Sequence, residues 1–364
     1  MATAQIEPSE PSSLLVEMVK ATPKKKLVRR TAPDYSQRLR RSFQLAFVVL
    51  DVALGVQFCR FVRFYELGGV GQAPSRPAGV EGFLPIAGLM SLKATLLTGT
   101  MPKIHAAGMF LIVAFLAISF VFRKTFCSWL CPVGTLSEYL WKLGRKLFGN
   151  VRVPRALDVV LRGLKYVLLA LFLWAVYSMA PRDVHAFLES PYGLIVDVKM
   201  LNFFRYLGET GLIVLGVLVL LSVVIQNFWC RYLCPYGALM GLVSMLSPLK
   251  ITRNVDSCID CAKCAKACPS HLPVDHLVTI KSAECTGCLE CVAVCPAEKT
   301  LVFAAPKRKV VPVWAVAAGI AAIFLGTVGY AKLTGRWESK IPAQVYRQLI
   351  PNADEAAHPM PGQD

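Results

Sequence analysis

The amino-acid sequence predicts an α-helical polytopic membrane protein with about five transmembrane helices and a small α+β domain inserted before the last helix. Hydrophobic residues make up 55% of the 364-residue chain. The mean hydropathy is positive, unlike that of a typical soluble protein of this length. Eight of the 13 cysteines lie between Cys258 and Cys295, and this dense stretch marks the inserted domain.

Five apolar runs carry the membrane prediction. A helix needs about 20 apolar residues to cross a bilayer. Runs that approach or reach this length occupy residues 43–58, 104–122, 166–180, 211–229 and 310–331. Buried helices of a large soluble protein are the competing interpretation, and the basic flanks of the runs disfavour it. The segment 83–97 is short and contains Lys93, so we expect an interfacial or re-entrant helix on the outer side.

Basic residues set the predicted orientation. Segment 20–41 contains nine Lys or Arg, and segment 123–165 is similarly rich, whereas loops 66–103 and 181–209 are poorer. The positive-inside rule therefore places the N-terminus, the 123–165 loop and the cysteine-rich domain in the cytoplasm. Five crossings then put the C-terminal tail on the outer side.

The predicted domain boundaries follow from these patterns. They are a mobile basic tail at 1–41, a membrane domain at 42–249, the cysteine-rich domain at 250–305, a last transmembrane helix at 306–332 and an outer tail at 333–364. The net charge of +17 is mostly a topology signal, because the basic residues flank membrane helices. No nucleic-acid-binding motif accompanies this charge, so we expect membrane lipid and no nucleic acid among the partners.

The cysteine-rich domain contains two copies of the pattern Cys-x2-Cys-x2-Cys-x3-Cys-Pro. This is the spacing of bacterial [4Fe–4S] ferredoxins, in which the fourth cysteine of each run ligates the cluster of the other run. The expected cluster-1 cysteines are Cys258, Cys261, Cys264 and Cys295. The expected cluster-2 cysteines are Cys285, Cys288, Cys291 and Cys268. Structural zinc is disfavoured, because zinc sites usually use separated pairs without the third cysteine and the proline.

Two short strands and two helices should complete this domain. Segments 250–253 and 301–304 are the expected outer strands, with a helix after each cysteine run. The approximate repetition of the two runs favours a ferredoxin-like arrangement.

A second cysteine pattern, Cys-x3-Cys-Pro, occurs where two of the apolar runs end. Its copies supply four residues, which we name the CxxxCP cysteines: Cys127, Cys131, Cys230 and Cys234. The predicted topology places both copies at the cytoplasmic membrane boundary, and they resemble an internal repeat. On a helix, the i and i+4 positions put both sulfurs of a pair on one face. Four thiols suffice for one further metal or iron–sulfur centre; a redox-active thiol pair and plain packing are the alternatives.

The two Cys-x3-Cys-Pro motifs and the two ferredoxin runs follow one another along the chain in the same order as in known proteins. They resemble the motifs of the membrane-bound polyferredoxins of the NapH type and of the membrane half of NosR-type proteins. The resemblance covers residues 42–303 and includes the segment Glu81-Gly82-Phe83-Leu84-Pro85-Ile86. It implies a multi-pass protein of the bacterial inner membrane with a periplasmic C-terminal tail. It also implies electron transfer between the quinone pool, two [4Fe–4S] clusters and other iron–sulfur or cytochrome subunits of respiration. This chain has an additional helix and an outer tail beyond the NapH pattern.

Three functions are compatible with this resemblance. The first is a respiratory electron-transfer subunit. Such a subunit would be a redox component of a quinol dehydrogenase and not a stand-alone enzyme. The second is an accessory protein that reduces a metal or thiol during respiratory metalloenzyme assembly, as the related CcoG-like branch implies. The third is a redox sensor, for which the sequence shows no effector domain. We rank them in this order.

Asp51 lies inside the first apolar run, where a carboxylate is costly and therefore a functional candidate. It is a candidate acceptor of a quinol proton. A structural ion pair with Arg60, Arg63 or Lys93 is the favoured interpretation, because arginines follow on the same helix. His105 is predicted near the outer surface, where a packing role is the ordinary one.

Overall fold

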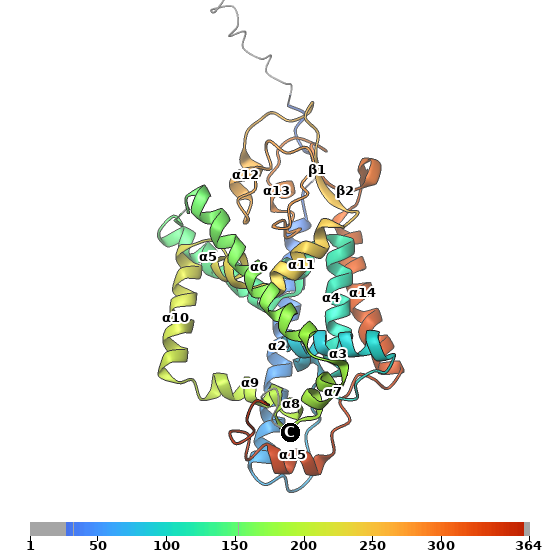
Figure 1. Ribbon diagram of the computed structural model, residues 1–364. Helices are drawn as coiled ribbons and strands as arrows, with labels where there is room; N and C mark the ends of the chain where they lie inside the picture. Colours follow the sequence, from blue (N-terminus) through green and yellow to red (C-terminus); the bar gives the residue numbers. More distant parts are fainter. Residues whose placement is uncertain (1–26, 32, 152, 360–364) are drawn as a thin grey trace, which may run out of the picture.

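The computed structural model describes residues 27–31, 33–151 and 153–359, which fold mainly into helices. The cysteine-rich domain lies at one end of a helical bundle, and the C-terminal end lies at the other (Figure 1). Residues 1–26 of the predicted basic tail and residues 360–364 of the predicted outer tail lie outside the described residues. Four helices make up most of the bundle: α2 (Ser36–Glu66), α4 (Ala106–Phe122), α6 (Arg155–Ser178) and α14 (Val313–Leu333).

Three of the described helices, α2, α6 and α14, are long and apolar enough to cross a bilayer. A fourth span is added if α9 (Val196–Arg205) and α10 (Glu209–Val224), which meet at 82°, are counted as one. Helix α4 is apolar but has 17 residues. The predicted count of five spans is therefore not confirmed. The run at 104–122 is shortened because His105 has the left-handed φ of 54° and α4 begins only after it.

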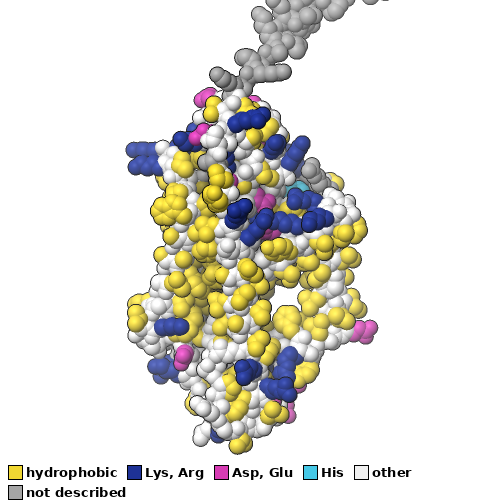
Figure 2. Space-filling view, turned by 180° about the vertical axis from the view of Figure 1, so that it is seen from behind, with side chains coloured by type: hydrophobic (Ala, Val, Ile, Leu, Met, Phe, Trp, Pro, Cys, Tyr) yellow, Lys and Arg dark blue, Asp and Glu magenta, His cyan; other side chains and the backbone are white. Residues whose placement is uncertain are grey.

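Charge and apolar surface are segregated along the molecule. One face carries hydrophobic side chains over its middle, with most Lys and Arg side chains toward the two ends (Figure 2). Helix α10 stands away from the rest of the bundle (Figure 1), and most of its residues are exposed. A hole in the molecule, surrounded mainly by hydrophobic side chains, is visible on this face (Figure 2). An apolar belt between charged ends is the pattern expected of a bilayer-spanning protein.

The segment predicted as interfacial forms helix α3 (Pro85–Thr98), which packs across α4. Gly88 of α3 lies so close to Gly108 of α4 that a Cβ at Gly88 would stand 2.8 Å from the Gly108 carbonyl oxygen. The buried Lys93 Nζ donates to the carbonyl oxygens of Val176 at 3.0 Å and Tyr177 at 3.2 Å. These carbonyls belong to the last turn of α6, so Lys93 caps that helix.

Short helices lie at the end of the bundle that is opposite the cysteine-rich domain, where Figure 1 shows α7, α8 and α15. They are η1 (Ala78–Phe83), α7 (Pro181–Glu189), α8 (Pro191–Leu194) and α15 (Ala343–Leu349). A buried ionic network at this end joins η1 to α9 (Val196–Arg205) and to the segment before α15. Arg76 Nη1 lies 2.9 Å from Glu81 Oε1 and its Nη2 lies 2.6 Å from Asp197 Oδ2, while Ser339 donates to Glu81 at 2.8 Å.

The chain contains an internal repeat of helix, π-helical turn and helix. Its first copy is α4, the π turn Phe126–Leu130 (η2) and α5 (Pro132–Leu147). Its second copy is α10, the π turn Trp229–Leu233 (η3) and α11 (Pro235–Met245). Proline is the first residue of α5 and of α11, where its missing N–H and fixed φ favour helix initiation.

The cysteine-rich domain has a three-stranded antiparallel sheet. Its order is β1 (Lys250–Arg253), β2 (Leu301–Ala305) and β3 (Lys309–Val310), with the short turn η4 (Pro306–Arg308) before β3. Ile251 pairs with Phe303 in the register of β1 and β2, which confirms the two predicted strands. The two short helices, α12 (Lys263–Ala267) and α13 (Glu290–Ala293), lie inside the cysteine runs rather than after them. The third cysteine of each run is therefore helical.

The chain before α2 binds to the cysteine-rich domain. Arg30 N–H donates to the Pro296 carbonyl oxygen at 2.9 Å, and Glu298 N–H donates to the Val28 carbonyl oxygen at 2.9 Å. Helix α2 already begins at Ser36. Two parts of the predicted mobile tail at 1–41 are therefore ordered differently: residues 28–30 pair with the cysteine-rich domain, and residues 36–41 belong to α2.

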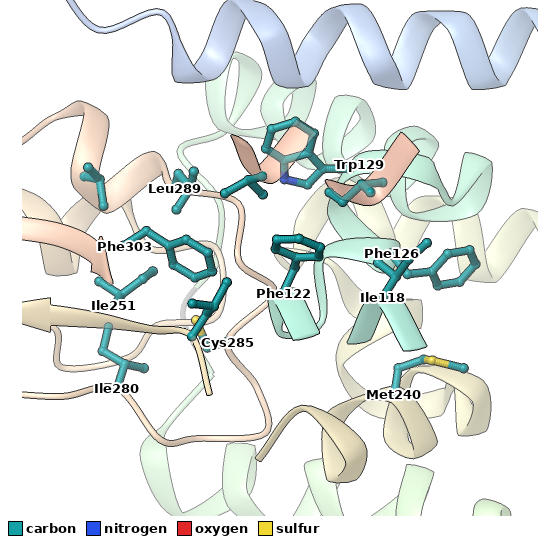
Figure 3. Packing of buried hydrophobic residues seen from close by; sticks show 14 of the residues in the cluster. Ile118, Phe122, Phe126, Trp129, Met240, Ile251, Ile280, Cys285, Leu289 and Phe303 are labelled. Carbon is teal, nitrogen blue, oxygen red and sulfur yellow. The ribbon is translucent and has the colours of Figure 1, made fainter. Parts of the chain in front are cut away.

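One hydrophobic core joins the bundle to the cysteine-rich domain. Ile118 and Phe122 of α4 belong to the same cluster of buried residues as Ile251 and Phe303 of the sheet. Trp129 and Leu289 belong to the same cluster and lie above these two groups in the view of Figure 3. Continuous burial of this kind opposes independent movement of the domain, because separation would expose the apolar area to water.

We predict that Gly144→Ala destabilises the protein by about 1–3 kcal/mol, because overpacking is costly at close contacts. A Cβ at Gly144 of α5 would overlap the carbonyl oxygen of Val223 in α10. Gly163→Ala on α6 is the matched control, since nothing lies within 4 Å of its added Cβ. Thermal unfolding in detergent measures both. Equal unfolding temperatures for the two variants would show that α5 and α10 do not cross here.

Candidate iron–sulfur and thiolate centres

The four cluster-1 cysteines line one small cavity. Cys258, Cys261, Cys264 and Cys295 all contribute to its wall, although Cys295 comes from the second run. The pKa of the Cys295 thiol is raised by burial and further by the nearby Cys261 and Cys258. The structure thus brings Cys295 to the first run, as crossed ligation requires.

The four cluster-2 cysteines form a second group that is buried throughout: Cys268, Cys285, Cys288 and Cys291. Burial and, to a smaller extent, the neighbouring Cys285 raise the pKa of Cys268 to about 11. Burial raises the pKa of the Cys291 thiol, and the neighbouring Cys288, Cys285 and Cys268 contribute to the same shift. Cys268 therefore lies with the second run rather than with its sequence neighbours.

The backbone of both runs is shaped in the same way around the second cysteine. Asp260 and Ala262 flank Cys261 with φ of 54° each, and Gly287 and Leu289 flank Cys288 with φ of 62° and 59°. Left-handed residues on both sides of a cysteine wrap the chain tightly around its sulfur. Soft thiolates in such loops suit iron–sulfur clusters.

All 13 cysteines lie in the described part of the chain and none forms a disulfide. Within those residues, no three His, Cys, Asp or Glu side chains are grouped as ligands of a single metal ion.

The CxxxCP cysteines converge on one cavity of about 680 Å³. Cys127, Cys131, Cys230 and Cys234 all line it, two from each copy of the internal repeat. The pKa of Cys131 is raised by burial and then by Cys127 and Cys230, so the two pairs are electrostatic neighbours. The two copies, about 100 residues apart in sequence, therefore contribute cysteines to the same cavity.

The local geometry of each CxxxCP pair differs from the α-helix that the spacing suggested. Cys131 N–H donates to the Phe126 carbonyl oxygen and Cys234 N–H donates to the Trp229 carbonyl oxygen, both at 3.0 Å, which are i to i+5 bonds of a π turn. Proline then prevents the helix from continuing without a break. Single π turns are frequent at functional sites because they reorient side chains.

The second sulfur of each pair caps the following helix. Gly134 N–H donates to Cys131 Sγ at 3.5 Å, and Gly237 N–H donates to Cys234 Sγ at 3.2 Å. The sulfurs therefore lie at the positive ends of α5 and α11, where a thiolate is favoured. A Cβ at Gly134 would overlap the carbonyl oxygen of Cys127, so only glycine fits this position. The CxxxCP motif is thus extended to Cys-x3-Cys-Pro-x-Gly.

A buried lysine faces these sulfurs. Lys124 is 4% exposed and lines the cavity. Burial lowers the pKa of its ammonium group, but Cys127 and Glu284 raise it above its ordinary value overall. Glu284 also accepts from Lys165 at 2.6 Å. Burial raises the pKa of the Cys127 thiol to about 11 and outweighs Lys124 and Lys165, which lower this pKa.

The loop that contains the cluster-2 cysteines rests directly on the first π turn. Ser128 Oγ donates to the Thr286 carbonyl oxygen at 2.6 Å, and Trp129 Nε1 donates to the Gly287 carbonyl oxygen at 3.4 Å. Cys288 itself lines the CxxxCP cavity. One cluster-2 cysteine therefore borders the cavity of the CxxxCP cysteines, whereas no cluster-1 cysteine lines that cavity.

A buried ion-pair network holds this junction together. The Arg40 guanidinium binds both carboxylate oxygens of Glu138 at 2.6 and 2.7 Å and Glu290 at 3.0 Å, which joins α2, α5 and α13. Burial would raise the pKa of Glu138, but Arg40 and Lys142 lower it to about 2. Gln44 donates to both Glu138 and the Ser128 carbonyl oxygen at 3.0 Å. The sequence did not predict this network, because Arg40 stands out there only as one of the basic residues of segment 20–41.

Asp51 does not form the predicted ion pair. Its Oδ2 is buried without a hydrogen-bond partner, and no cation of the described residues pairs with it. Lys93 is occupied at the end of α6, and Arg60 and Arg63 are exposed. The structural interpretation was wrong because Asp51 faces the cavity of the CxxxCP cysteines instead.

His105 belongs to the buried ionic network of Arg76, Glu81 and Asp197. Its Nε2 lies 2.7 Å from the Gly193 carbonyl oxygen and its Nδ1 lies 3.5 Å from Glu81. Burial would lower the pKa of His105, but Glu81 raises it above its ordinary value overall. The packing role predicted for this histidine agrees with these contacts.

Comparison with known proteins identifies the repeat and the domain separately. A 4Fe-4S binding domain family matches residues 104–150 and again residues 207–254, which are the two copies of the internal repeat. A 4Fe-4S dicluster domain family matches residues 250–296. No solved structure matches the chain significantly.

Three relatives match this chain over different lengths, and one of them covers most of it. It is 48% identical over 326 residues to the putative electron transport protein YccM of Escherichia coli, covering 88% of this chain and 91% of that one. It is 29% identical over 210 residues to the ferredoxin-type protein NapH of Haemophilus influenzae, covering 55% and 68%. It is 32% identical over 165 residues to the regulatory protein NosR of Pseudomonas aeruginosa, covering 44% and 22%.

The bundle, the two cysteine patterns and these matches define a membrane-bound iron–sulfur protein that transfers electrons. The chain belongs to the NapH/NosR-type family of membrane-bound polyferredoxins.

We predict that Cys268→Ser selectively damages the cluster of Cys285, Cys288 and Cys291, because a serine oxygen is a poorer ligand than a thiolate for iron. Electron paramagnetic resonance of the reduced protein measures the loss of each cluster signal. Cys295→Ser is the reciprocal control and should damage the other cluster. Loss of the cluster of Cys258, Cys261 and Cys264 in Cys268→Ser would contradict crossed ligation.

Proposed function

We propose that the protein relays electrons between the membrane quinone pool and a respiratory redox partner through two [4Fe–4S] clusters, which supply one-electron transfer when bound. The observation that carries this proposal is the shared cavity. Cys288 of the cluster-2 group and all CxxxCP cysteines line it together with apolar side chains of α2. A lipid-soluble electron carrier in this cavity would therefore stand beside the cysteines that hold the redox centres.

The placement of the cysteines gives the relay an order. The CxxxCP cysteines would hold a further metal or iron–sulfur centre at the bundle, beside the cluster-2 cysteines. The cluster-1 cysteines are more distant from the cavity, and Cys261 is exposed. A soluble or membrane-bound partner subunit would exchange electrons with the protein at this exposed end.

We further propose that five segments cross the bacterial inner membrane. Helix α4 and the bent pair α9–α10 would supply two crossings beside α2, α6 and α14. The cysteine-rich domain and Arg30 lie at one end of the bundle, and α15 lies at the other (Figure 1). This arrangement supports a cytoplasmic N-terminus and cluster domain with a periplasmic C-terminal tail.

Reduction by quinol tests the proposal. We expect the purified protein in lipid nanodiscs to show two [4Fe–4S] signals on reductive titration and to exchange electrons with added decylubiquinol or decylubiquinone. Electron paramagnetic resonance with and without the quinone measures this. Clusters that cycle with dithionite but never respond to either quinone form would favour the alternative, an accessory protein that reduces a metal or thiol during assembly.

We predict that Cys127→Ala and Cys230→Ala each lower the iron content of the protein and slow quinone-linked reduction, because each removes one thiolate of a shared site. Cys59→Ala is the control, since Cys59 is exposed on α2 and does not line the cavity. Iron quantification separates a metal site from a thiol relay. If both variants keep all iron and full electron transfer, the CxxxCP cysteines have a structural role alone.

A further inference from the structure

Asp51 lies on the inward face of α2. A stripe at helical spacing faces the interior of the protein: Arg40, Gln44, Phe47, Asp51, Leu54 and Phe58. The opposite face exposes Leu45, Val49, Val52 and Val56, as expected of a surface in contact with lipid. The carboxylate is therefore directed into the protein and away from the lipid.

The position of Asp51 along α2 makes its burial costly. It lies fifteen residues from Ser36 and fifteen residues from Glu66, at the midpoint of the helix. A side chain at this depth cannot reach either membrane surface. Its Oδ2 has no hydrogen-bond partner in the described structure. A half-buried carboxylate with an oxygen that is buried and has no partner is a functional candidate, because no interaction in the described structure offsets the desolvation of that oxygen.

The cavity beside Asp51 suits a planar, lipid-soluble ligand. Phe47, Leu54 and Phe115 form apolar walls next to the carboxylate. Leu50 and Phe83 also line the cavity and are each 42% exposed, so the cavity opens to the surface beside the lipid-facing side of α2. A ligand with an apolar ring would enter from the membrane at this opening and place a polar ring substituent at Asp51.

Asp51 is also close in depth to the CxxxCP cysteines. Gln44 of α2 contacts the Ser128 carbonyl oxygen in the first π turn. Asp51 follows Gln44 by seven residues, which is about 10 Å along a helix axis. Both Asp51 and the CxxxCP cysteines line the same cavity. A ring bound between them would contact a proton acceptor on one side and lie near the redox centres on the other.

We propose that Asp51 is the proton acceptor for a quinol bound in this cavity. This inference rests on the proposed function. When the quinol is oxidised to quinone, its two O–H bonds break, and two electrons pass one at a time to the oxidised iron–sulfur centres. The Asp51 carboxylate accepts one proton, and the other is released to bulk water. Quinone reduction uses the same steps in reverse, with protonated Asp51 as the donor.

The test uses full-length protein in lipid nanodiscs with decylubiquinone and decylubiquinol as probes. Asp51→Asn keeps the size of the side chain and removes its proton affinity, and Asp51→Glu restores a carboxylate. Glu189→Gln, an exposed acid outside the cavity, is the control. We expect Asp51→Asn to keep its iron, to be reduced normally by dithionite and to bind decylubiquinone within about threefold of the wild-type affinity.

Electron exchange between the quinone probes and the clusters should slow about 100-fold in Asp51→Asn, the size of a typical general-base effect. Asp51→Glu should recover most of this loss. A readout independent of activity is infrared difference spectroscopy, where a protonated-carboxyl band should appear in wild type on quinol oxidation and be absent in Asp51→Asn.

Two results overturn the inference. Exchange rates in Asp51→Asn within threefold of wild type, with the carboxyl band retained, would assign the proton to another group and leave the proposed function intact. If wild-type protein neither binds decylubiquinone nor exchanges electrons with it, the proposed function fails. Asp51 then cannot be the proton acceptor for a bound quinol. Should Asp51→Asn fail to fold, the comparison of Asp51→Glu with wild type by infrared spectroscopy decides the point, because the band must shift with the side chain.

Discussion

The contact between the cluster-2 loop and the first π turn is the constraint on which the rest of the arrangement depends. Gly287 lies against Thr125 so closely that a Cβ would stand 2.7 Å from the threonine methyl group, and its φ is +62°. Glycine alone tolerates both conditions. This close approach allows Trp129 to reach the Gly287 carbonyl oxygen, and it brings Cys288 to the cavity of the CxxxCP cysteines. The proposed electron transfer between the two groups of cysteines depends on this contact.

The internal repeat explains how a membrane helix bundle holds thiolates at its edge. Each copy breaks an apolar helix with a π turn, restarts it at proline and lets the preceding cysteine sulfur accept from the new helix. Two helix N-termini and the buried Lys124 then face the same group of sulfurs. These positive groups offset the cost of burying negative thiolates beside a bilayer. The Arg40–Glu138 pair fixes α2 on this assembly and thereby positions Asp51.

Local patterns in the sequence predicted the features that depend on neighbouring residues. The cysteine spacings indicated both cysteine groups and the internal repeat, and short β-rich segments gave β1 and β2. Features that need distant partners were not predictable. Arg40 finds Glu138 only after folding, and Asp51 lacks the partner that its sequence neighbours suggested. The predicted count of five spans was not confirmed for a related reason. His105 delays the start of α4, and α10 ends at Val224 although the apolar run continues to residue 229.

Docking of the cluster domain on the bundle is the central claim, and Gly287→Ala tests it most directly. The added methyl group should separate the loop from Thr125, so the domain would move away from the CxxxCP cavity. The decisive measurement is the rate of electron exchange between decylubiquinol and the clusters in variant protein that retains full iron. The account predicts a fall of at least about tenfold, since added distance weakens transfer while dithionite reduction stays normal. An unchanged rate in iron-replete Gly287→Ala protein would contradict it.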